Sequence, residues 1–487
     1  MNIKSLSWVF IVINLAGCGA FGPERNPPKM PAPEHFAAGP QATNWPAADG
    51  VAQQPDIGAR PVPEWWKAYD SDALNALVEE GLKNSPSLSA AQYTLKAARE
   101  GLRAQIGQSL WPSVDVGFDP SRQRALVLPT VAPPTYQYDV FAAEVQGSYT
   151  FDFFGAAFLA NRALAHQIDQ QAYQFEALRR ALAANIVVAV INAASLHAQV
   201  TATEELVALG EERARQVAAR YQLGSATRDD MLTAEQDAAN AAATLPPLRA
   251  QALAVRHALA VLLGRTPDQA PEPLPLDALQ LPEAVPVSVA SDLLHQRPDI
   301  LAAEAALRAA ADEAGAATAS MFPSLTLSAA YGRGGFDWST FTSPMGAIWS
   351  VGASLTQPLF HGGALVARKR QYQATYDAAV AQYRQTVLAA FQNVADTLVS
   401  LEQDADAVTQ TRRAATAAKD MHESTQARYK LGSSPIYATL TARQQYENAS
   451  VQYIRARAAR MADTAALFES MGEPPTERSP QFASRVR

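Results

Sequence analysis

Long helical stretches dominate the pattern of apolar and polar positions along this chain. Residues 156–223 and 361–431 contain no proline and almost no glycine after their first turn, and alanine is abundant in both. At 1.5 Å per residue, a helix of this length extends roughly 100 Å. Because such helices must cover their apolar sides with neighbours, we predict a helical bundle or coiled-coil packing for both stretches.

The first of these stretches carries two separate stripes. Its apolar stripe, with spacings of four and seven residues, is formed by Leu196, Val200 and Val207. Its polar stripe recurs every seven residues, at Asn185, Asn192 and Gln199. This pattern fits a helix with one buried and one solvated face, and it equally fits a polar stripe that faces an internal aqueous space.

A second pattern, strict alternation of apolar and polar residues, predicts four short strands. Every even position of residues 143–153 is polar, residues 349–356 alternate likewise, and shorter alternations occupy residues 113–118 and 324–329. Each segment is about long enough to cross a bilayer when tilted, although a half-buried strand of a soluble sheet would alternate too. The polar side of the first segment, which we assign to a wet interior, comprises Glu144, Gln146, Ser148, Thr150 and Asp152.

The first residues carry the features of a secreted lipoprotein. Lys4 is followed by a short apolar stretch and then by Cys18, the only cysteine. This order is typical of a signal peptide, and the ending Leu-Ala-Gly-Cys resembles the bacterial lipobox. We therefore predict a signal peptide at residues 1–17 and lipidation of Cys18, against the alternative of a buried cysteine. Gly19 in place of aspartate favours the outer membrane, and no later apolar run of about 18 residues predicts a transmembrane helix.

Together these observations place the predicted strands in a membrane. Four strands cannot close a barrel, because the smallest closed membrane barrels have about eight, and open edges in lipid leave backbone groups unpaired. Several chains must therefore contribute strands, and a polar interior favours three chains over two. Aromatic residues lie near the strand ends, as in an interfacial girdle, at Trp111, Phe153, Phe154, Phe322, Trp349 and Phe360.

One seven-residue motif occurs twice and marks an internal duplication. ARYQLGS at residues 219–225 and ARYKLGS at residues 427–433 lie 208 residues apart, and the 23 positions from each motif onward share 12 residues. We interpret residues 72–264 and 292–471 as two copies of one unit, each with a helix, two strands and a long helical hairpin. The remaining segments are a proline-rich strap or disordered linker at 18–71, a linker at 265–291 and a tail at 472–487.

Charge and composition disfavour several other classes of function. The net charge of −7 argues against a nucleic-acid-binding surface. The seven histidines are scattered, and no HExxH, Cys–His or GxSxG arrangement occurs. We therefore predict that the chain is not an enzyme and that it holds no metal and no cofactor besides the lipid on Cys18. Dispersed methionines also disfavour a copper or silver exporter.

Several longer motifs resemble the TolC-type outer membrane efflux proteins, in the lipoprotein branch that includes NodT-like and OprM-like members. The resemblance covers nearly the whole mature chain, and RPDI followed by AxE, together with QPLFxGG, is close to diagnostic for that branch. The matching stretches are LAGC (15–18), WWKAYDSDALNALVEEGLKNSPSL (65–88), RPDILAAEAAL (297–307), FPSLTLSAAYG (322–332), LTQPLFHGG (355–363) and both LGS motifs.

The resemblance implies a mixed α and β membrane protein that assembles as a homotrimer. The family fold is a 12-stranded β-barrel in the outer membrane of a Gram-negative bacterium, continued through the periplasm by a 12-helix α-barrel with a mixed equatorial belt. The implied function is a passive exit duct for small molecules such as drugs. It docks on a periplasmic adaptor and an inner-membrane pump, commonly a proton-driven exporter of the RND type. A duct for type I protein secretion and a periplasmic adaptor lipoprotein are the alternatives.

The repeated motif matches the periplasmic tips of this family, where paired helices reverse direction. Gly224 and Gly432 are the residues that can take positive φ at such a turn. The implied tip and adaptor-docking residues are Arg220, Tyr221, Leu223, Gly224 and Ser225 in the first copy, and Arg428, Tyr429, Leu431, Gly432 and Ser433 in the second. Their arginine and tyrosine side chains also fit an ordinary solvated surface.

The periplasmic gate of the family lies just beyond the second glycine, often with a carboxylate nine positions after it. Here that position is Thr441, and Tyr437 lies five residues after Gly432, so we do not expect a carboxylate gate on the second hairpin. The first copy instead carries Asp229 and Asp230. We predict a gate lined by Tyr437 and Thr441, with an acidic collar from the two aspartates of each chain. Ordinary helix N-terminal charge is the alternative role of the aspartates.

Overall fold

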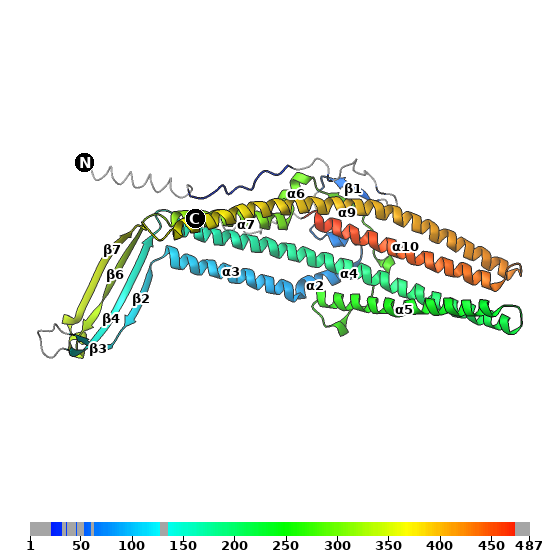
Figure 1. The fold of residues 1–487 in the computed structure, drawn as a ribbon, viewed down its shortest axis with the longest axis horizontal. Helices are drawn as coiled ribbons and strands as arrows, with labels where there is room; N and C mark the ends of the chain where they lie inside the picture. The colour runs from blue at the N-terminus through cyan, green and yellow to red at the C-terminus, as the bar shows by residue number, and fades with distance from the viewer. Residues whose placement is uncertain are drawn as a thin grey trace.

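The computed structural model describes residues 21–31, 36, 45, 53–59, 63–126 and 135–472. A β-sheet occupies one end of an elongated molecule, long helices run along it, and two hairpin turns lie at the opposite end (Figure 1). The first half contains β1 (Gln54–Ile57), η1 (Trp65–Tyr69), α2 (Asp72–Asn84), α3 (Pro86–Leu110), β2 (Ser113–Phe118), β3 (Ser121–Leu126), β4 (Thr135–Phe151), α4 (Ala156–Gln222) and α5 (Arg228–Leu262). The second half contains η2 (Pro267–Gln269), η3 (Leu276–Ala278), β5 (Ala284–Val287), α6 (Ala290–Gln296), α7 (Pro298–Ala319), β6 (Ser324–Gly335), α8 (Trp338–Thr342), η4 (Pro344–Gly346), β7 (Ala347–Thr356), α9 (Ala364–Lys430) and α10 (Ile436–Ser470).

The four strands predicted from alternation are confirmed, and they form one antiparallel sheet in the order β2-β4-β6-β7. Ser148 of β4 lies opposite Ser113 of β2 and Ser328 of β6, and Ser328 lies opposite Gly352 of β7. β4 begins earlier than the alternation indicates, at Thr135, and its first part pairs with the unpredicted strand β3. Within the described chain, neither β2 nor β7 has a strand partner on its outer edge.

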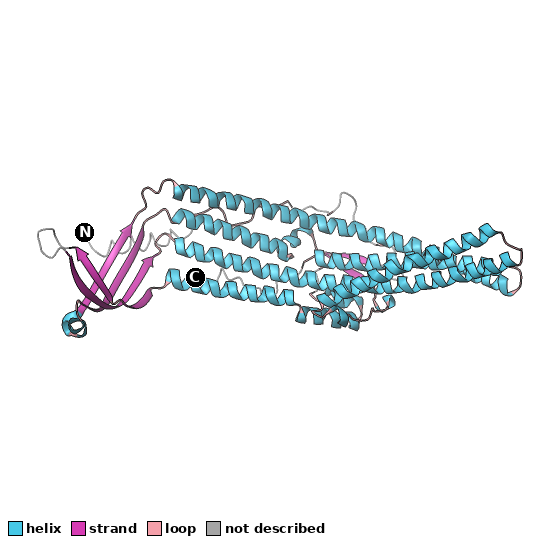
Figure 2. Cartoon of the chain, turned by 60° about the horizontal axis from the view of Figure 1, so that its bottom comes forward, coloured by secondary structure: helices cyan, strands magenta, loops and turns pink. Residues whose placement is uncertain are grey.

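Two helices of 67 residues each, α4 and α9, form the framework of the molecule. α3 and α5 pack along α4, whereas α7 and α10 pack against both α4 and α9. The chain therefore forms a wall of four side-by-side tracks (Figure 2), with α3 and α5 sharing one track and α7 and α10 sharing another. The prediction that both long stretches are helices packed against neighbours is confirmed.

In the two shared tracks, helices meet end to end at a glycine. Gly264 follows α5 with a φ of +77°, and a Cβ there would lie 2.7 Å from the carbonyl oxygen of Asn84, the last residue of α2. Gly472 follows α10 with a φ of +74°, and its Cβ would lie 2.9 Å from the carbonyl carbon of Gln296. Glycine alone fits a positive φ against so close a neighbour. The two glycines lie 208 residues apart, which is also the spacing of the tip motifs.

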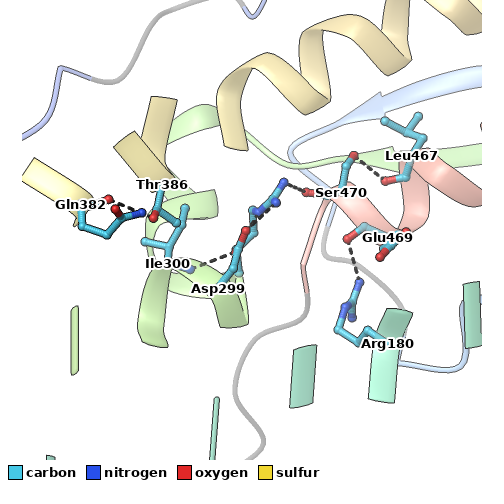
Figure 3. A network of polar contacts seen from close by, with 9 residues as sticks. Arg180, Asp299, Ile300, Gln382, Thr386, Leu467, Glu469 and Ser470 are labelled. Carbon is cyan, nitrogen blue, oxygen red and sulfur yellow. Dashed lines mark hydrogen bonds and ion pairs between the residues drawn. The ribbon is translucent and has the colours of Figure 1, made fainter. Parts of the chain in front are cut away.

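The RPDI motif holds the joint between α10 and α7 (Figure 3). Arg297 Nη1 donates to the carbonyl oxygen of Ser470 at 2.9 Å, and Arg297 Nη2 donates to Asp299 Oδ2 at 2.7 Å. Arg180 of α4 donates from Nη2 to the carbonyl oxygen of Phe468 at 3.0 Å. Both cations therefore meet the carbonyl end of α10, where the helix dipole favours positive charge.

A smaller layer covers the middle of the helical wall, where the main hydrophobic core lies. β1 and β5 pair in parallel within this layer. The fully buried Gln53 accepts a hydrogen bond at Oε1 from Arg460 Nε of α10, at 3.0 Å. The hydroxyl of Tyr69, in η1, donates to the carbonyl oxygen of Met461 at 2.6 Å. This part of the proline-rich segment is therefore packed against α10.

One described helix, α4, contains a stretch that is long and apolar enough to cross a membrane. The sequence pattern did not indicate such a stretch, because short polar interruptions divide it. Most of it is buried within the chain, and Ile186, Val187, Val190 and Ile191 are each at most 2% exposed. Its apolar residues are therefore core residues of the helical wall.

Candidate functional site

The register of the sheet separates polar from apolar side chains along most of its length, and near the outer end Ile348 lies on the polar side and Arg333 on the apolar side. Residues directly opposite each other in an antiparallel pair project to the same face. One face combines Ser113, Asp115, Glu144, Gln146, Ser148, Thr150, Thr326, Ser328, Ser350, Ser354 and Thr356. The other combines Val114, Val116, Phe118, Val145, Tyr149, Phe151, Leu325, Leu327, Tyr331, Trp349, Val351 and Leu355.

Hydrogen bonds connect the side chains of the polar face. The hydroxyls of Ser113 and Ser148 are 2.9 Å apart, and those of Thr150 and Thr326 are also 2.9 Å apart. Gln146 Nε2 donates to Glu144 Oε2 at 3.2 Å. Four of the five residues assigned to the wet side, all except Asp152, belong to this face. It can line a water-filled path.

Asp152 corrects that assignment, because it lies one residue beyond β4. Its Oδ2 accepts a hydrogen bond from the backbone N–H of Phe158, in the first turn of α4, at 2.7 Å. A carboxylate at this position satisfies an otherwise unpaired helix donor and interacts favourably with the helix dipole. Asp152 thus joins the sheet to α4.

The apolar face of the sheet is strongly exposed in the single chain. Val116 is 79% exposed, Val351 77% and Trp349 74%. Among the described helices only the short α8 packs on this face, at the outer end of the sheet, where Phe341 lies 6.0 Å from Phe118 and 6.2 Å from Phe141 between ring centroids, and no long helix covers it (Figure 1). An apolar surface of this extent is incompatible with water, and it fits the hydrocarbon region of a membrane.

At the opposite end of the molecule the two tips have the same backbone geometry. Gly224 has a φ of +71° and Gly432 a φ of +73°, as the turn prediction requires. The N–H of Ser225 donates to the carbonyl oxygen of Arg220 at 2.8 Å, and Ser433 repeats this bond to Arg428 at 2.9 Å. Each pattern is that of a Schellman turn, which ends a helix at a glycine. The serine hydroxyls bond to the same two carbonyl oxygens.

Each tip presents apolar and aromatic side chains to its surroundings. Leu223 is 83% exposed and Leu431 is 82% exposed. The preceding Tyr221 and Tyr429 are 40% and 43% exposed. Leucines at turns that no described residue covers are suited to pack against a partner.

The aspartates of the first tip have different surroundings. Asp230 forms a capping box with Thr227: its N–H donates to the threonine hydroxyl at 3.1 Å, and its Oδ2 accepts from the threonine N–H at 2.9 Å. The threonine hydroxyl also donates to Asp230 Oδ2 at 2.7 Å, and this bond, followed by the one from the threonine N–H, lowers the pKa of Asp230. Asp230 therefore stabilises the start of α5, which is the alternative role that we gave the aspartates in the sequence analysis. Asp229 is exposed in the same turn.

A cation–π contact joins the two tips of one chain. The guanidinium carbon of Arg220 lies 5.8 Å from the ring centroid of Tyr437. The same guanidinium donates from Nη2 to the carbonyl oxygen of Ser225 at 3.2 Å, which holds it at the turn. The hydroxyl of Thr441 donates to the Tyr437 carbonyl oxygen at 3.0 Å, within the first turns of α10. The structure thus brings Tyr437, one of the two predicted gate residues of the second hairpin, to the first hairpin.

A buried ionic cluster near the sheet was not predicted from the sequence. Asp312 of α7 is fully buried and lies 2.6 Å from Arg25 Nε of the strap and 2.7 Å from Arg162 Nη2 of α4. Phe21 lies against Phe322, with ring centroids 4.9 Å apart. The segment that follows Cys18 is therefore docked where the sheet meets the helices, and Cys18 lies outside the described residues.

Among the described residues, no group of three or more histidine, cysteine, aspartate or glutamate side chains could hold a metal ion. The polar residues described above have other roles: they line one face of the sheet, cap helix ends or connect segments of the chain. Such an arrangement provides a surface for passage and for docking.

These features define a class of protein. A sheet with a polar and an apolar face, continued by a long helical wall with exposed hairpin tips, is the subunit of an outer membrane channel with mixed α and β structure. The family model for outer membrane efflux proteins matches residues 77–265 and 289–473. The chain belongs to that family, which confirms the resemblance seen in the sequence.

Individual relatives agree over nearly the whole length. The pyoverdine export outer membrane protein OpmQ of Pseudomonas aeruginosa is 28% identical over 484 residues, covering 97% of each chain. The toluene efflux pump outer membrane protein TtgC of Pseudomonas putida is 27% identical over 481 residues, covering 97% of this chain and 96% of its own. The solved structure of the outer membrane protein VceC from Vibrio cholerae matches with a TM-score of 0.73 and 27% identity, over 85% of this chain and 100% of that chain. The family and these relatives are transport proteins rather than enzymes.

Proposed function

We propose that three copies of this chain form the outer membrane exit duct of a tripartite efflux system, which conducts small molecules passively out of the cell. The observation that carries the proposal is the four-stranded sheet with one polar face, one apolar face and two unpaired edges, continuous with a four-track helical wall. Family membership supports the same conclusion.

The free edges of the sheet account for the trimer. Among the described residues, the outer edges of β7 and β2 have no strand partner. Unpaired backbone groups cost several kcal/mol each in hydrocarbon. Pairing β7 of one chain with β2 of the next removes both edges. Three chains then close a barrel of 12 strands above a tunnel of 12 helical tracks, with the polar face inward.

The tips account for the partners. Leu223, Leu431 and the neighbouring tyrosines lie at the end farthest from the membrane sheet, where a periplasmic adaptor and an inner-membrane pump of the RND type would meet the duct. Relatives named for pyoverdine export and toluene efflux support small molecules as cargo.

The contact between the tips provides a gate. Arg220 holds Tyr437 from the neighbouring hairpin, so the second hairpin is connected to the first at the narrow end of the tunnel. Tyr437 and Thr441 line this gate, and Asp229 contributes the free carboxylate of the collar. Opening requires the loss of one exposed cation–π contact per chain, which is a small cost.

The docked strap supports a lipid anchor on Cys18. Phe21 contacts Phe322 at the end of the sheet, and Cys18 precedes Phe21 by three residues. Three extended residues reach about 10 Å, so a lipid on Cys18 would enter the same membrane that holds the sheet.

Planar-bilayer recording of the purified chain tests this function. The proposal predicts discrete conductance steps, together with accumulation of a fluorescent efflux substrate in cells that lack the chain. Absence of conductance from protein that inserts into the bilayer, with unchanged dye accumulation, would contradict the duct.

A further inference from the structure

A cationic patch lies where α9 leaves the membrane sheet. Arg368, Lys369 and Arg370 are consecutive in the second turn of the helix, and all three are exposed. β7 ends at Thr356 and α9 begins at Ala364. The patch therefore begins about 6 Å along the helix axis, directly below the strands.

The positive charge of this patch is not compensated within the described chain. None of its three cations forms an ion pair or hydrogen bond through its side chain with a described residue. By contrast, Arg162 on α4 is paired with the buried Asp312 at 2.7 Å. Because three adjacent cations repel one another, an anion bound beside them from outside the chain relieves that repulsion.

One member of the patch, Lys369, faces the side of the wall along which the strap runs. Lys369 and Tyr376 lie seven residues apart and therefore share a helix face. The hydroxyl of Tyr376 donates to the carbonyl oxygen of Glu24 at 2.9 Å. Lys369 consequently lies above the docked strap, on the side of the predicted lipid anchor, and Arg370 is next to it around the helix.

Apolar side chains adjoin the patch on its membrane side. Leu359 is 90% exposed and Phe360 is 86% exposed, and Leu355 at the end of β7 is 72% exposed. The order along the chain is therefore apolar strand, apolar linker and then cations. A bilayer leaflet has the same order, with hydrocarbon followed by phosphate headgroups.

A neighbouring chain does not supply the missing anions, and this step rests on the proposed trimer. Closing the barrel places α3 of one chain beside α9 of the next. α3 carries Lys96, Arg99 and Arg103 but only one acid, Glu100, which is already paired with Arg103 at 2.7 Å. The neighbour adds positive charge to this seam.

We propose that Arg368, Lys369 and Arg370 form a binding site for anionic phospholipid headgroups of the inner leaflet of the outer membrane. Arginine binds phosphate oxygens in pairs, and lysine contributes a point charge. The site holds lipid at the seam between chains, beside the membrane end of the duct.

Native mass spectrometry of the detergent-purified chain, titrated with phosphatidylglycerol or phosphatidylcholine, tests this site. The double variant Lys369→Gln, Arg370→Gln is expected to bind phosphatidylglycerol about 25-fold more weakly, because each basic residue near an anionic surface contributes about fivefold. The matched control is Arg412→Gln, Arg413→Gln, two consecutive exposed cations of the same helix about 65 Å farther from the sheet. The control is expected to bind like the unaltered chain.

Equal phosphatidylglycerol affinity in the two double variants would overturn the site, as would equal affinity for the zwitterionic lipid. Displacement of phosphatidylglycerol by excess inorganic phosphate would assign the site to free phosphate instead. The same spectra report the mass of the assembly. Detection of monomers alone would refute the trimer, while the comparison of the variants would still decide the lipid site.

Discussion

At the tips, the side chain of Arg220 connects two segments that are far apart in the sequence. Its guanidinium lies over Tyr437 and also interacts favourably with the carboxylate of Asp230. The sequence predicted that the two tips differ, because the second copy has Tyr437 where the first has Asp229. It did not predict the contact, because meeting of the two hairpins depends on how α4 packs against α10 along their length.

Replacing Tyr437 by alanine removes the aromatic ring under Arg220. An exposed cation–π contact is worth about 0.5–1 kcal/mol, so the open state should gain about two- to fivefold relative to the closed state. Single-channel recording should show a larger open fraction and a higher mean conductance. Tyr429→Ala, at an exposed position outside the contact, is the control. If both variants behaved like the unaltered chain, the gate would lie elsewhere.

Asp404 provides a pH-dependent contribution to stability. The pKa of Asp404 is raised to about 7: burial contributes most, the neighbouring Asp463 also raises it, and Arg460 lowers it. An acid whose pKa is higher in the folded state than in the unfolded chain, where it is near 4, favours folding below pH 4. That contribution is lost as the pH rises through 7. Asp404→Asn should therefore flatten the dependence of Tm on pH and raise Tm at pH 8. An unchanged profile between pH 5 and 8 would rule this contribution out.

At the scale of elements, local patterns predicted what depends on neighbours in the sequence. Alternation revealed β2, β4, β6 and β7, because each strand separates polar from apolar side chains on its own. β3 was missed, since SRQRAL carries no such alternation and its partner is the outer part of β4. The role of the RPDI motif was also missed, because Arg297 bonds to the far end of another helix.

The end-to-end helix joints make a prediction that separates two kinds of glycine. Gly472→Ala places a Cβ 2.9 Å from the carbonyl carbon of Gln296, whereas Gly432→Ala meets nothing within 4 Å. Both changes carry the cost of positive φ, about 1–2 kcal/mol, and only Gly472→Ala adds a clash. Thermal unfolding should show a clearly larger loss of Tm for Gly472→Ala. Equal losses would mean that the joint relaxes freely.

The two faces of β7 make a second prediction. Val351→Arg places a charge on the apolar face, where a membrane midplane would impose about 2–4 kcal/mol. Ser350→Arg places the same charge on the polar face, one residue away. Membrane insertion, measured by heat-modifiable mobility, should fall for Val351→Arg and remain for Ser350→Arg. The reverse result would mean that the polar face points to lipid and the apolar face points into the barrel.

At the scale of the whole molecule, a single chain leaves surfaces that need partners. In the part of the chain that the structure describes, the sheet has two free edges, most of its apolar face is exposed, and the helical wall is one layer thick. Each of these features is costly for an isolated chain in water or in lipid. The number of strands in the sequence already predicted that several chains must combine. The order of the strands, which determines which edges are free, could be known only from the folded structure.

Electron cryomicroscopy of the full-length chain in lipid nanodiscs would show how the chains assemble. We expect a threefold particle whose closed barrel has 12 strands, with β7 of each chain paired to β2 of the next and Ser148 directed into the lumen. A monomeric or dimeric particle would contradict this expectation, and so would a barrel with its polar face toward lipid.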